Sequence, residues 1–202
     1  AEQRIYRELD LLSTIVRATG ALAANNRNFT LPTSAGTFVV VEQMNVITPA
    51  GVTDPELGTR NPMLPVSKEY LDTVYGSVSG AGVPSLFAPI SQQNLVLGAW
   101  PDAAYTVEVV GTIRPAPLSV SNPNTFLTDY LPDVFMAAAL VYAAGYQLNF
   151  GAAADNPQAG VNWETHLQKL LASAQKEEFR KKFGSQSWSS KEPDPIATPP
   201  RS

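Results

Sequence analysis

The chain contains no cysteine and a single histidine, His166, among its 202 residues. Without cysteine there can be no disulfide bond, thiolate metal ligand or cysteine nucleophile. A zinc site built from several histidines is excluded for the same kind of reason. We therefore expect neither a metal ion nor another cofactor.

Charged residues are also scarce, at 16% of the composition, and the formal net charge is −4. The chain has no cluster of basic residues like those that form a dedicated DNA-binding face. Acidic residues outnumber basic ones ten to three between positions 28 and 160, whereas basic residues prevail seven to five from 161 onward. Ordinary solvated surface accounts for this distribution as well as a functional surface does.

An apolar stretch, LPDVFMAAALVYAAGYQLNF, covers residues 131–150. Pro132 and Asp133 are typical of the first turn of a helix. A helix that is apolar nearly all round is buried on most of its sides. Its uncharged apolar run, Val134–Ala144, is shorter than the roughly 20 apolar residues that span a bilayer. We predict a helix packed in a helical layer, within one subunit or between subunits, with Ala138 and Ala143 both buried.

A second helix is predicted to follow and to end near Phe183. Asp155 and Gln158 have the spacing of a capping box, and Gly184 is a typical residue just past a helix end. Apolar residues recur at helical spacing along this segment: Trp163, Leu167, Leu170, Leu171 and Ala174.

The rest of the chain supplies a first helix and many strand signals. Residues 1–13 place Ile5 and Leu9 on one helical side, and Ser67 is expected to cap a short helix. The clearest strand, Tyr105–Arg114, alternates apolar and polar residues. This order predicts an α+β fold: an α-helical bundle, made of the N-terminal helix plus two long C-terminal helices, with an inserted antiparallel β-rich region.

The predicted boundaries follow from these elements. The helical parts cover 1–13 and 125–183, the β-rich insert covers 14–124, and residues 1–183 form a single domain. The proline- and serine-rich residues 184–202 are expected to be an extended C-terminal tail outside the core. Trp188 and Ile196 are apolar residues within that tail, and either could anchor a partner.

Acidic pairs raise the possibility of an enzyme, and each has a simpler explanation. Asp129 and Asp133 could act as the carboxylates of a glycan hydrolase, but a helix N-terminus favours acidic residues at both positions. Asp54 and Glu56 could bind a cation, yet the calcium-loop pattern is absent. His166 lacks any serine or cysteine motif arranged with it, so we expect no catalytic site.

A glycan-binding module remains an alternative interpretation. Trp100 and Tyr105 lie in the β-rich region, where exposed aromatic rings could stack on sugars. A tail-associated glycan-binding module or glycan hydrolase is therefore kept as the second hypothesis.

Five segments together resemble bacteriophage head-to-tail adaptor proteins, also called connector or head completion proteins, of the tail tubular A type. They are AEQRIYREL, KEYLDTVYG, LVLGAWPDAAYTVEVVGTIRPAPLS, TFLTDYLPDVFMAAALVYAAGYQ and NWETHLQKLLASAQKEEF. The resemblance covers most of residues 1–183. In members of this family the opening motif follows further residues, so we expect that residues upstream of Ala1 are missing.

The resemblance implies a structural virion protein and not an enzyme. Such adaptors form a ring, commonly a dodecamer, that joins the capsid portal to the tail or nozzle proteins and continues the channel for double-stranded DNA. Genome retention and ejection then proceed without sequence-specific DNA binding, and an acidic middle region would let DNA slide. The resemblance also implies that the protein is assembled in the host cytoplasm, lies at the head–tail interface of the virion and contacts no membrane.

The resemblance also implies that the C-terminal tail reaches along the portal. The expected portal-binding residues are therefore the apolar side chains at the end of the last helix and in the tail: Phe179, Phe183, Trp188 and Ile196.

Overall fold

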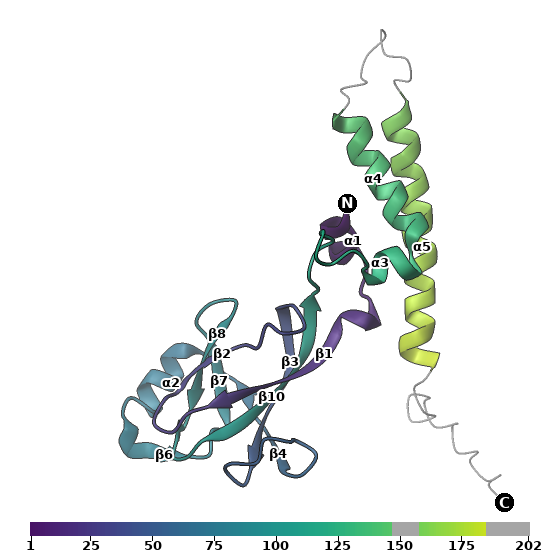
Figure 1. The fold of residues 1–202 in the computed structure, drawn as a ribbon. Helices are drawn as coiled ribbons and strands as arrows, with labels where there is room; N and C mark the ends of the chain where they lie inside the picture. The colour runs from purple at the N-terminus through teal and green to yellow at the C-terminus, as the bar shows by residue number, and fades with distance from the viewer. Residues whose placement is uncertain (147–157, 185–202) are drawn as a thin grey trace, which may run out of the picture. The chain divides into compact units, whose positions relative to one another are not determined.

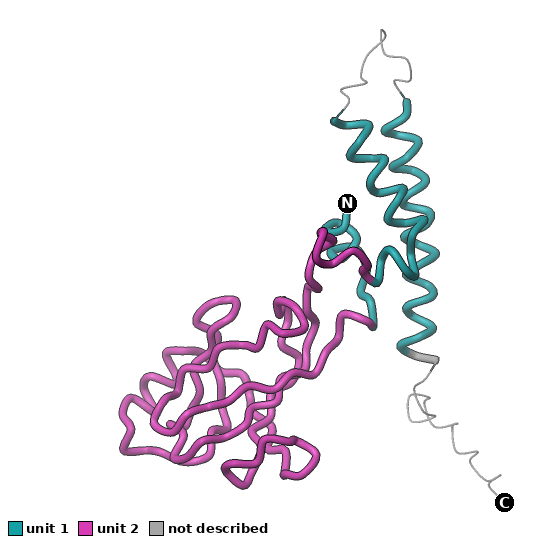
Figure 2. The backbone as a smooth tube through the Cα atoms, viewed as in Figure 1, with its two compact units in different colours: residues 1–12, 126–202 teal, residues 13–125 magenta. Residues whose placement is uncertain are grey.

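The computed structural model describes residues 1–146 and 158–184, the last two without their side chains. The chain divides into two units (Figure 2). Residues 1–12 and those from 126 onward form what we call the helical unit, and Ser13–Thr125 form the β unit. Each unit has apolar clusters of its own, so the two are described separately.

The helical unit contains α1 (Glu2–Glu8), α3 (Phe126–Tyr130), α4 (Pro132–Tyr146) and α5 (Ala159–Gly184) (Figure 1). α4 lies beside α5, and α1 and α3 contact α4 near its N-terminal half. The core of the unit is made of aliphatic side chains from all four helices and the segment after α1: Ile5, Leu9, Leu11, Leu127, Leu131, Val134, Ala137, Ala138, Leu167, Leu171 and Ala174.

The β unit follows a 3-10 turn at Leu12–Thr14 and contains ten strands and the helix α2 (Lys68–Val74). The strands are β1 (Ile15–Leu22), β2 (Asn28–Thr30), β3 (Thr37–Thr48), β4 (Thr59–Pro62), β5 (Leu64–Pro65), β6 (Ala81–Gly82), β7 (Leu86–Pro89), β8 (Asn94–Gly98), β9 (Trp100–Pro101) and β10 (Tyr105–Arg114). A second 3-10 turn covers Val78–Gly80.

The strands form two four-stranded sheets and one short pair. The first sheet is antiparallel with the order β1-β10-β3-β4, and the second has the order β2-β8-β7-β5. The pairs β5–β7 and β6–β9 are parallel. β10 is central in the first sheet because it pairs with β1 on one side and with β3 on the other.

Apolar side chains from both sheets form the main core of the β unit, and they include Phe29, Phe38, Met44 and Val107. A smaller cluster lies under α2, where Leu71 packs with Ala88 and Val96. Phe38, Met44 and Leu71 are at most 1% exposed. The β unit therefore has two apolar clusters that the helices of the other unit do not supply.

The expected α-helical bundle with a β insert is wrong. The residues that the structure describes form ten strands in sheets and five helices, and the fold is mixed α/β. The strands carry their own cores, so the β region is not an appendage of a helical bundle. The expected purely antiparallel pairing is wrong too, because β5 and β6 pair in parallel with distant strands.

The first helix is shorter than the predicted 1–13. α1 ends at Glu8 because Leu9 adopts an extended conformation, with φ −108° and ψ 131°. Leu9 and Leu11 then enter the core from an irregular segment and not from a helical face. Helical spacing of apolar residues was misleading here, since burial can follow the same spacing without a helix.

Two local predictions are confirmed. The side chain of Ser67 accepts a hydrogen bond from the Tyr70 backbone N–H and caps α2. The strand predicted at Tyr105–Arg114 is β10 with the same bounds. The capping box at Asp155–Gln158 falls largely outside the described residues, and the division into a 1–183 domain and a 184–202 tail stays a prediction.

The α4 helix is less buried than its sequence suggests. Val134, Ala137 and Ala138 are buried, but Met136 is 59% exposed and Ala143 is exposed. α4 is therefore covered on one side by its own subunit, and the prediction that Ala143 is buried is wrong within a single copy. Among the described residues, no helix combines the length and the apolar character needed to cross a membrane.

Candidate assembly surfaces

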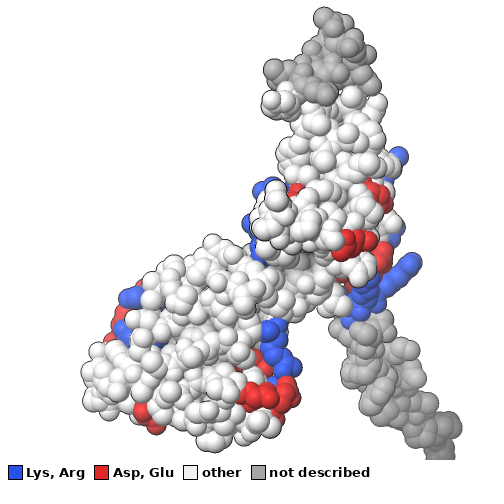
Figure 3. All heavy atoms as spheres, viewed as in Figure 1, with Lys and Arg blue, Asp and Glu red and all other residues white. Residues whose placement is uncertain are grey.

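The outer face of α4 is apolar and exposed. From Val134 to Tyr146 the helix carries no charged residue. Five exposed positions follow one another along its uncovered side, and we call them the outer α4 face: Met136, Ala139, Tyr142, Ala143 and Tyr146. Figure 3 shows that charged side chains are few toward this end of the helical unit on the face drawn.

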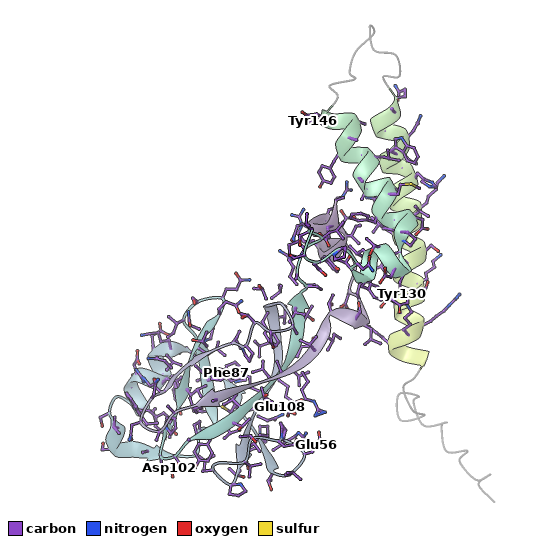
Figure 4. All side chains as sticks on the ribbon, viewed as in Figure 1. Glu56, Phe87, Asp102, Glu108, Tyr130 and Tyr146 are labelled. Atoms are coloured by element: carbon purple, nitrogen blue, oxygen red, sulfur yellow. The ribbon has the colours of Figure 1, made fainter. Side chains whose placement is uncertain are left out.

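Tyr146 ends this face and is 90% exposed (Figure 4). Tyr130, at the end of α3, is 71% exposed and stacks on Phe126, with ring centroids 4.9 Å apart. Small residues between large ones let a second helix approach closely, and the exposed rings add contact area. The outer α4 face is thus suited to contact with another apolar protein surface.

Another exposed aromatic residue, Phe179, lies on α5. It is 62% exposed and shares its side of the helix with Gln175, Lys176 and Arg180. Of the predicted portal-binding residues, only Phe179 can be placed in full. Phe183 belongs to α5, but its side chain is outside the described residues, as are Trp188 and Ile196.

Ion pairs fix the N-terminal segment to α5. The guanidinium of Arg4 donates hydrogen bonds to both carboxylate oxygens of Glu164 and, through Nε, to Glu8 at 2.6 Å. Glu178, only 4% exposed, accepts from the backbone N–H of Leu12 at 2.9 Å. Because these bonds link α1 and the following segment to two points on α5, the long helix is held along its length.

The Arg4 guanidinium, helped by Gln168, lowers the pKa of the Glu164 carboxyl to about 2. The ordinary pKa is 4.5, so this stabilisation is fully present above that pH and is lost as the pH falls toward 2. The side chain is 37% exposed, and solvent screening limits the contribution to about 1 kcal/mol.

We expect Glu164→Gln to lower the melting temperature of the protein at pH 7. Near pH 2 the variant and the wild type should melt at almost the same temperature. Thermal unfolding of both proteins at pH 7, 4 and 2.5 checks this. Glu69→Gln, at an exposed position of α2, is the matched control and should follow the wild type throughout. A difference between Glu164→Gln and wild type that stays constant down to pH 2.5 would contradict the assignment.

The carboxylate pair considered for hydrolysis has structural roles. Asp133 accepts a hydrogen bond from the Val134 backbone N–H at 2.8 Å, at the start of α4. Asp129 accepts from the Thr128 hydroxyl at 3.3 Å. Both carboxylates therefore serve the local helix geometry, as their positions predicted.

The aromatic residues considered for glycan binding are engaged within the β unit. The indole N–H of Trp100 donates to the Tyr75 carbonyl at 2.8 Å, and its ring lies under the Arg27 guanidinium at 5.1 Å. Tyr105 is buried, and its hydroxyl donates to Asp102 at 2.6 Å. That bond, with burial, raises the pKa of Tyr105 to about 12.

The acidic loop between β3 and β4 is neutralised by arginine. Glu56 pairs with Arg17 at 2.7 Å and with Arg60 at 2.8 Å. Both arginines also reach Glu108, which is 2% exposed and accepts from Asn45 at 2.9 Å. Figure 4 shows Glu56 and Glu108 on neighbouring parts of the β unit.

Burial acts to raise the pKa of Glu108, but the hydrogen bonds from Arg60 and Asn45 outweigh it and leave the pKa below its ordinary value. Glu108 is therefore ionised and holds the two arginines that fix the loop. Asp54 accepts from the Glu56 backbone N–H at 3.0 Å, which gives it a turn-forming role in the same loop.

His166 is exposed on α5 and makes an edge contact with Trp163, with ring centroids 5.9 Å apart. Within the described ranges, no group of three or more histidine or acidic residues is placed to hold a metal ion. The main features of the described surface are therefore exposed apolar side chains, such as those of the outer α4 face, with few charged residues around them.

The sequence left open whether α4 packs within one subunit or between subunits, and it did not single out the residues of the outer α4 face. The signal was present, because a charge-free helix needs cover on more sides than one neighbour supplies. A single sequence does not tell whether that cover comes from the same copy or from another, and here the subunit leaves Met136, Tyr142 and Tyr146 exposed.

These features define a class of protein whose exposed surfaces are suited to protein–protein contacts. The model of the SU10 adaptor protein family matches residues 1–190, and the chain belongs to this family. It is accordingly a bacteriophage structural adaptor protein and a component of the virion. No curated protein matches the chain.

Proposed function

We propose that this adaptor assembles as a ring, a dodecamer, that joins the capsid portal to the tail and continues the DNA channel. Membership of the SU10 adaptor protein family supports an adaptor role. The earlier resemblance to head-to-tail adaptors of the tail tubular A type supplies the ring and the portal as the finer expectation. The protein acts as a structural component and not as an enzyme.

One observation carries the ring proposal, namely the uncovered outer α4 face. Met136, Tyr142 and Tyr146 are each at least half exposed in the single copy. Burial of apolar area yields roughly 25 cal/mol per Å², and an exposed apolar patch of contiguous residues marks an interaction site. A ring places the same face of every copy against a different face of its neighbour, so each outer α4 face is covered.

The portal contact is assigned to the C-terminal end of α5. Phe179 is exposed there beside Lys176 and Arg180. Phe183 follows one turn later, and Ile196 lies in the segment beyond. Aromatic side chains flanked by basic groups suit a partner surface that combines an apolar pocket with acidic residues.

DNA passes through the ring without sequence-specific contacts in this proposal. The excess of acidic over basic residues between positions 28 and 160 supports it. Binding of DNA grows with the number of phosphates that basic residues neutralise, so a charge-poor or acidic wall leaves the genome free to slide.

The test is particle size and symmetry, measured by light scattering and electron microscopy on the adaptor alone and with its cognate portal. We expect a closed ring, either in solution or formed upon addition of the portal. A monomer that ignores the portal would overturn the proposal.

A further inference from the structure

The β unit contains an apolar groove that its own described residues leave open. The groove lies between the N-terminal half of β3 and the strands β5 and β7, and its volume is about 660 Å³. Phe87 of β7, labelled in Figure 4, contributes to its wall. Glu42 is the only charged residue among those that line it.

The groove runs along an unpaired strand edge. β4 pairs with β3 only from Asn45 to Thr48, whereas β10 pairs with β3 along nearly all of its length. The backbone of Val39–Gln43 therefore has a strand neighbour on one side alone within the described residues. Just after β4, the backbone N–H of Met63 donates to the Met44 carbonyl. This is the last backbone hydrogen bond on that side of β3 before the open stretch.

Three valines, Val39 to Val41, give this edge apolar side chains next to the polar Glu42 and Gln43. Val39 is 47% exposed and Val40 is 52% exposed. Exposed edges in soluble proteins are usually protected by lysine, proline or a bulge on the edge itself. The register of β3 against β10 shifts twice along this stretch, at Glu42 and at Val39, so the edge is irregular. It carries no lysine or proline, however, and its exposed valines leave it accessible to another strand.

The chain itself contains a segment that fits this edge. Residues 185–202 follow α5, and these 18 residues could reach up to about 60 Å when extended. Their first eight residues, SQSWSSKE, contain no proline, so every backbone N–H in them can donate to a strand edge. Trp188 is flanked by serines. Its large apolar ring could fill an apolar groove while the small polar neighbours stay outside it.

Charge supports the same match. Lys191 lies three residues after Trp188, within reach of a carboxylate beside the groove. Glu42 supplies that carboxylate, and it is exposed. The groove offers no positive charge to bind an acidic peptide among its lining residues.

We propose that residues 185–192 of one copy add as a strand to the Val39–Gln43 edge of a neighbouring copy, with Trp188 in the groove. The proposal rests on the proposed ring, which brings copies side by side. It moves Trp188, one of the residues predicted to bind the portal, to the subunit contact and leaves Phe179, Phe183 and Ile196 to the portal. Each copy then gives its segment to one neighbour and receives the segment of the other.

The absence of cysteine makes a direct test possible. A copy carrying Val40→Cys is assembled with a copy carrying Ser187→Cys, and disulfide formation between them is followed on non-reducing gels. Val120 is fully exposed in the β unit, away from the groove lining, so Val120→Cys is the matched control. We expect the Val40→Cys pair to cross-link about tenfold faster, because seating raises the local concentration.

A second variant separates seating from chance collision. Adding Trp188→Ala to the Ser187→Cys copy should lower the Val40→Cys cross-linking rate to that of the Val120→Cys control. Equal rates for Val40→Cys and Val120→Cys in intact Trp188 copies would overturn the proposal. Cross-linking of Ser187→Cys to the portal alone would overturn it as well. So would a chain that carries both Val40→Cys and Ser187→Cys if it cross-links only within itself and never to a second copy.

Electron microscopy of the same samples separates this proposal from the ring itself. Rings without the Val40–Ser187 cross-link would leave the proposed function standing and remove the groove as the seat of Trp188. If no ring forms with or without the portal, the proposed function fails by its own test, and the cross-linking rate in solution still decides between seating and chance collision.

Discussion

Ala138→Trp should strongly destabilise the helical unit. Ala138 is 0% exposed and lies in the cluster formed with Val134, Leu167 and Leu171. An indole ring has no space there, and overpacking of a well-packed core costs about 1–3 kcal/mol, occasionally more. Since the side chain is enclosed between α4 and α5, relief would require the two helices to separate.

Thermal unfolding checks this, and the same substitution at Ala143 is the control. Ala143 belongs to the outer α4 face and is exposed in the single copy, so Ala143→Trp should melt close to the wild type when measured on the monomer. Two equal losses of stability would mean that α4 is enclosed on both sides by its own subunit. No loss in either variant would mean that Ala138 is not in a packed core.

The helical conformation of α4 could be predicted from the sequence, but the residues that surround it could not. Periodicity and the charge-free run were sufficient to predict a helix that needs apolar neighbours. They could not say which copy supplies those neighbours, because Ala137, Ala138 and Ala139 look alike in the sequence, and yet Ala139 is exposed. Burial of an alanine depends on the tertiary partner, and no local signal carries that information.

The β unit shows a similar limit. β10 was predictable because ten residues alternate between the two faces of a sheet. β5, β6 and β9 have two residues each, too few for any periodicity, and two of their pairings are parallel and distant in sequence. Non-local pairs of this kind made the expected antiparallel insert in a helical bundle wrong.

Of the four residues predicted to bind the portal, only Phe179 can be placed with its side chain, and portal binding stays a prediction for all four. An aromatic residue amid Lys176, Arg180 and Gln175 on a polar helix face stands out in the sequence, and the structure leaves it exposed. The groove beside Val39 and Val40 could not be predicted, since a run of valines in a strand is as typical of a buried strand as of an open edge. Only the short reach of β4 opens that edge.

Ala143→Glu should abolish ring formation while leaving the subunit folded. In the single copy the glutamate would point into solvent, so its effect on subunit stability is expected to stay within about 0.5 kcal/mol. In the ring it would be enclosed by the apolar surface of a neighbour, and burial of an unpaired carboxylate costs several kcal/mol. Because every interface of a closed ring would contain one such buried carboxylate, assembly should fail completely.

Light scattering and electron microscopy with the cognate portal measure the outcome, and the melting temperature of the variant confirms that its fold is intact. Ala50→Glu, at an exposed alanine of the β unit, is the matched control and should still form rings. Normal rings from Ala143→Glu would place the subunit interface elsewhere. Rings restored by a basic residue on the facing surface of the neighbouring copy would identify that surface, because the new carboxylate would then be paired instead of buried alone.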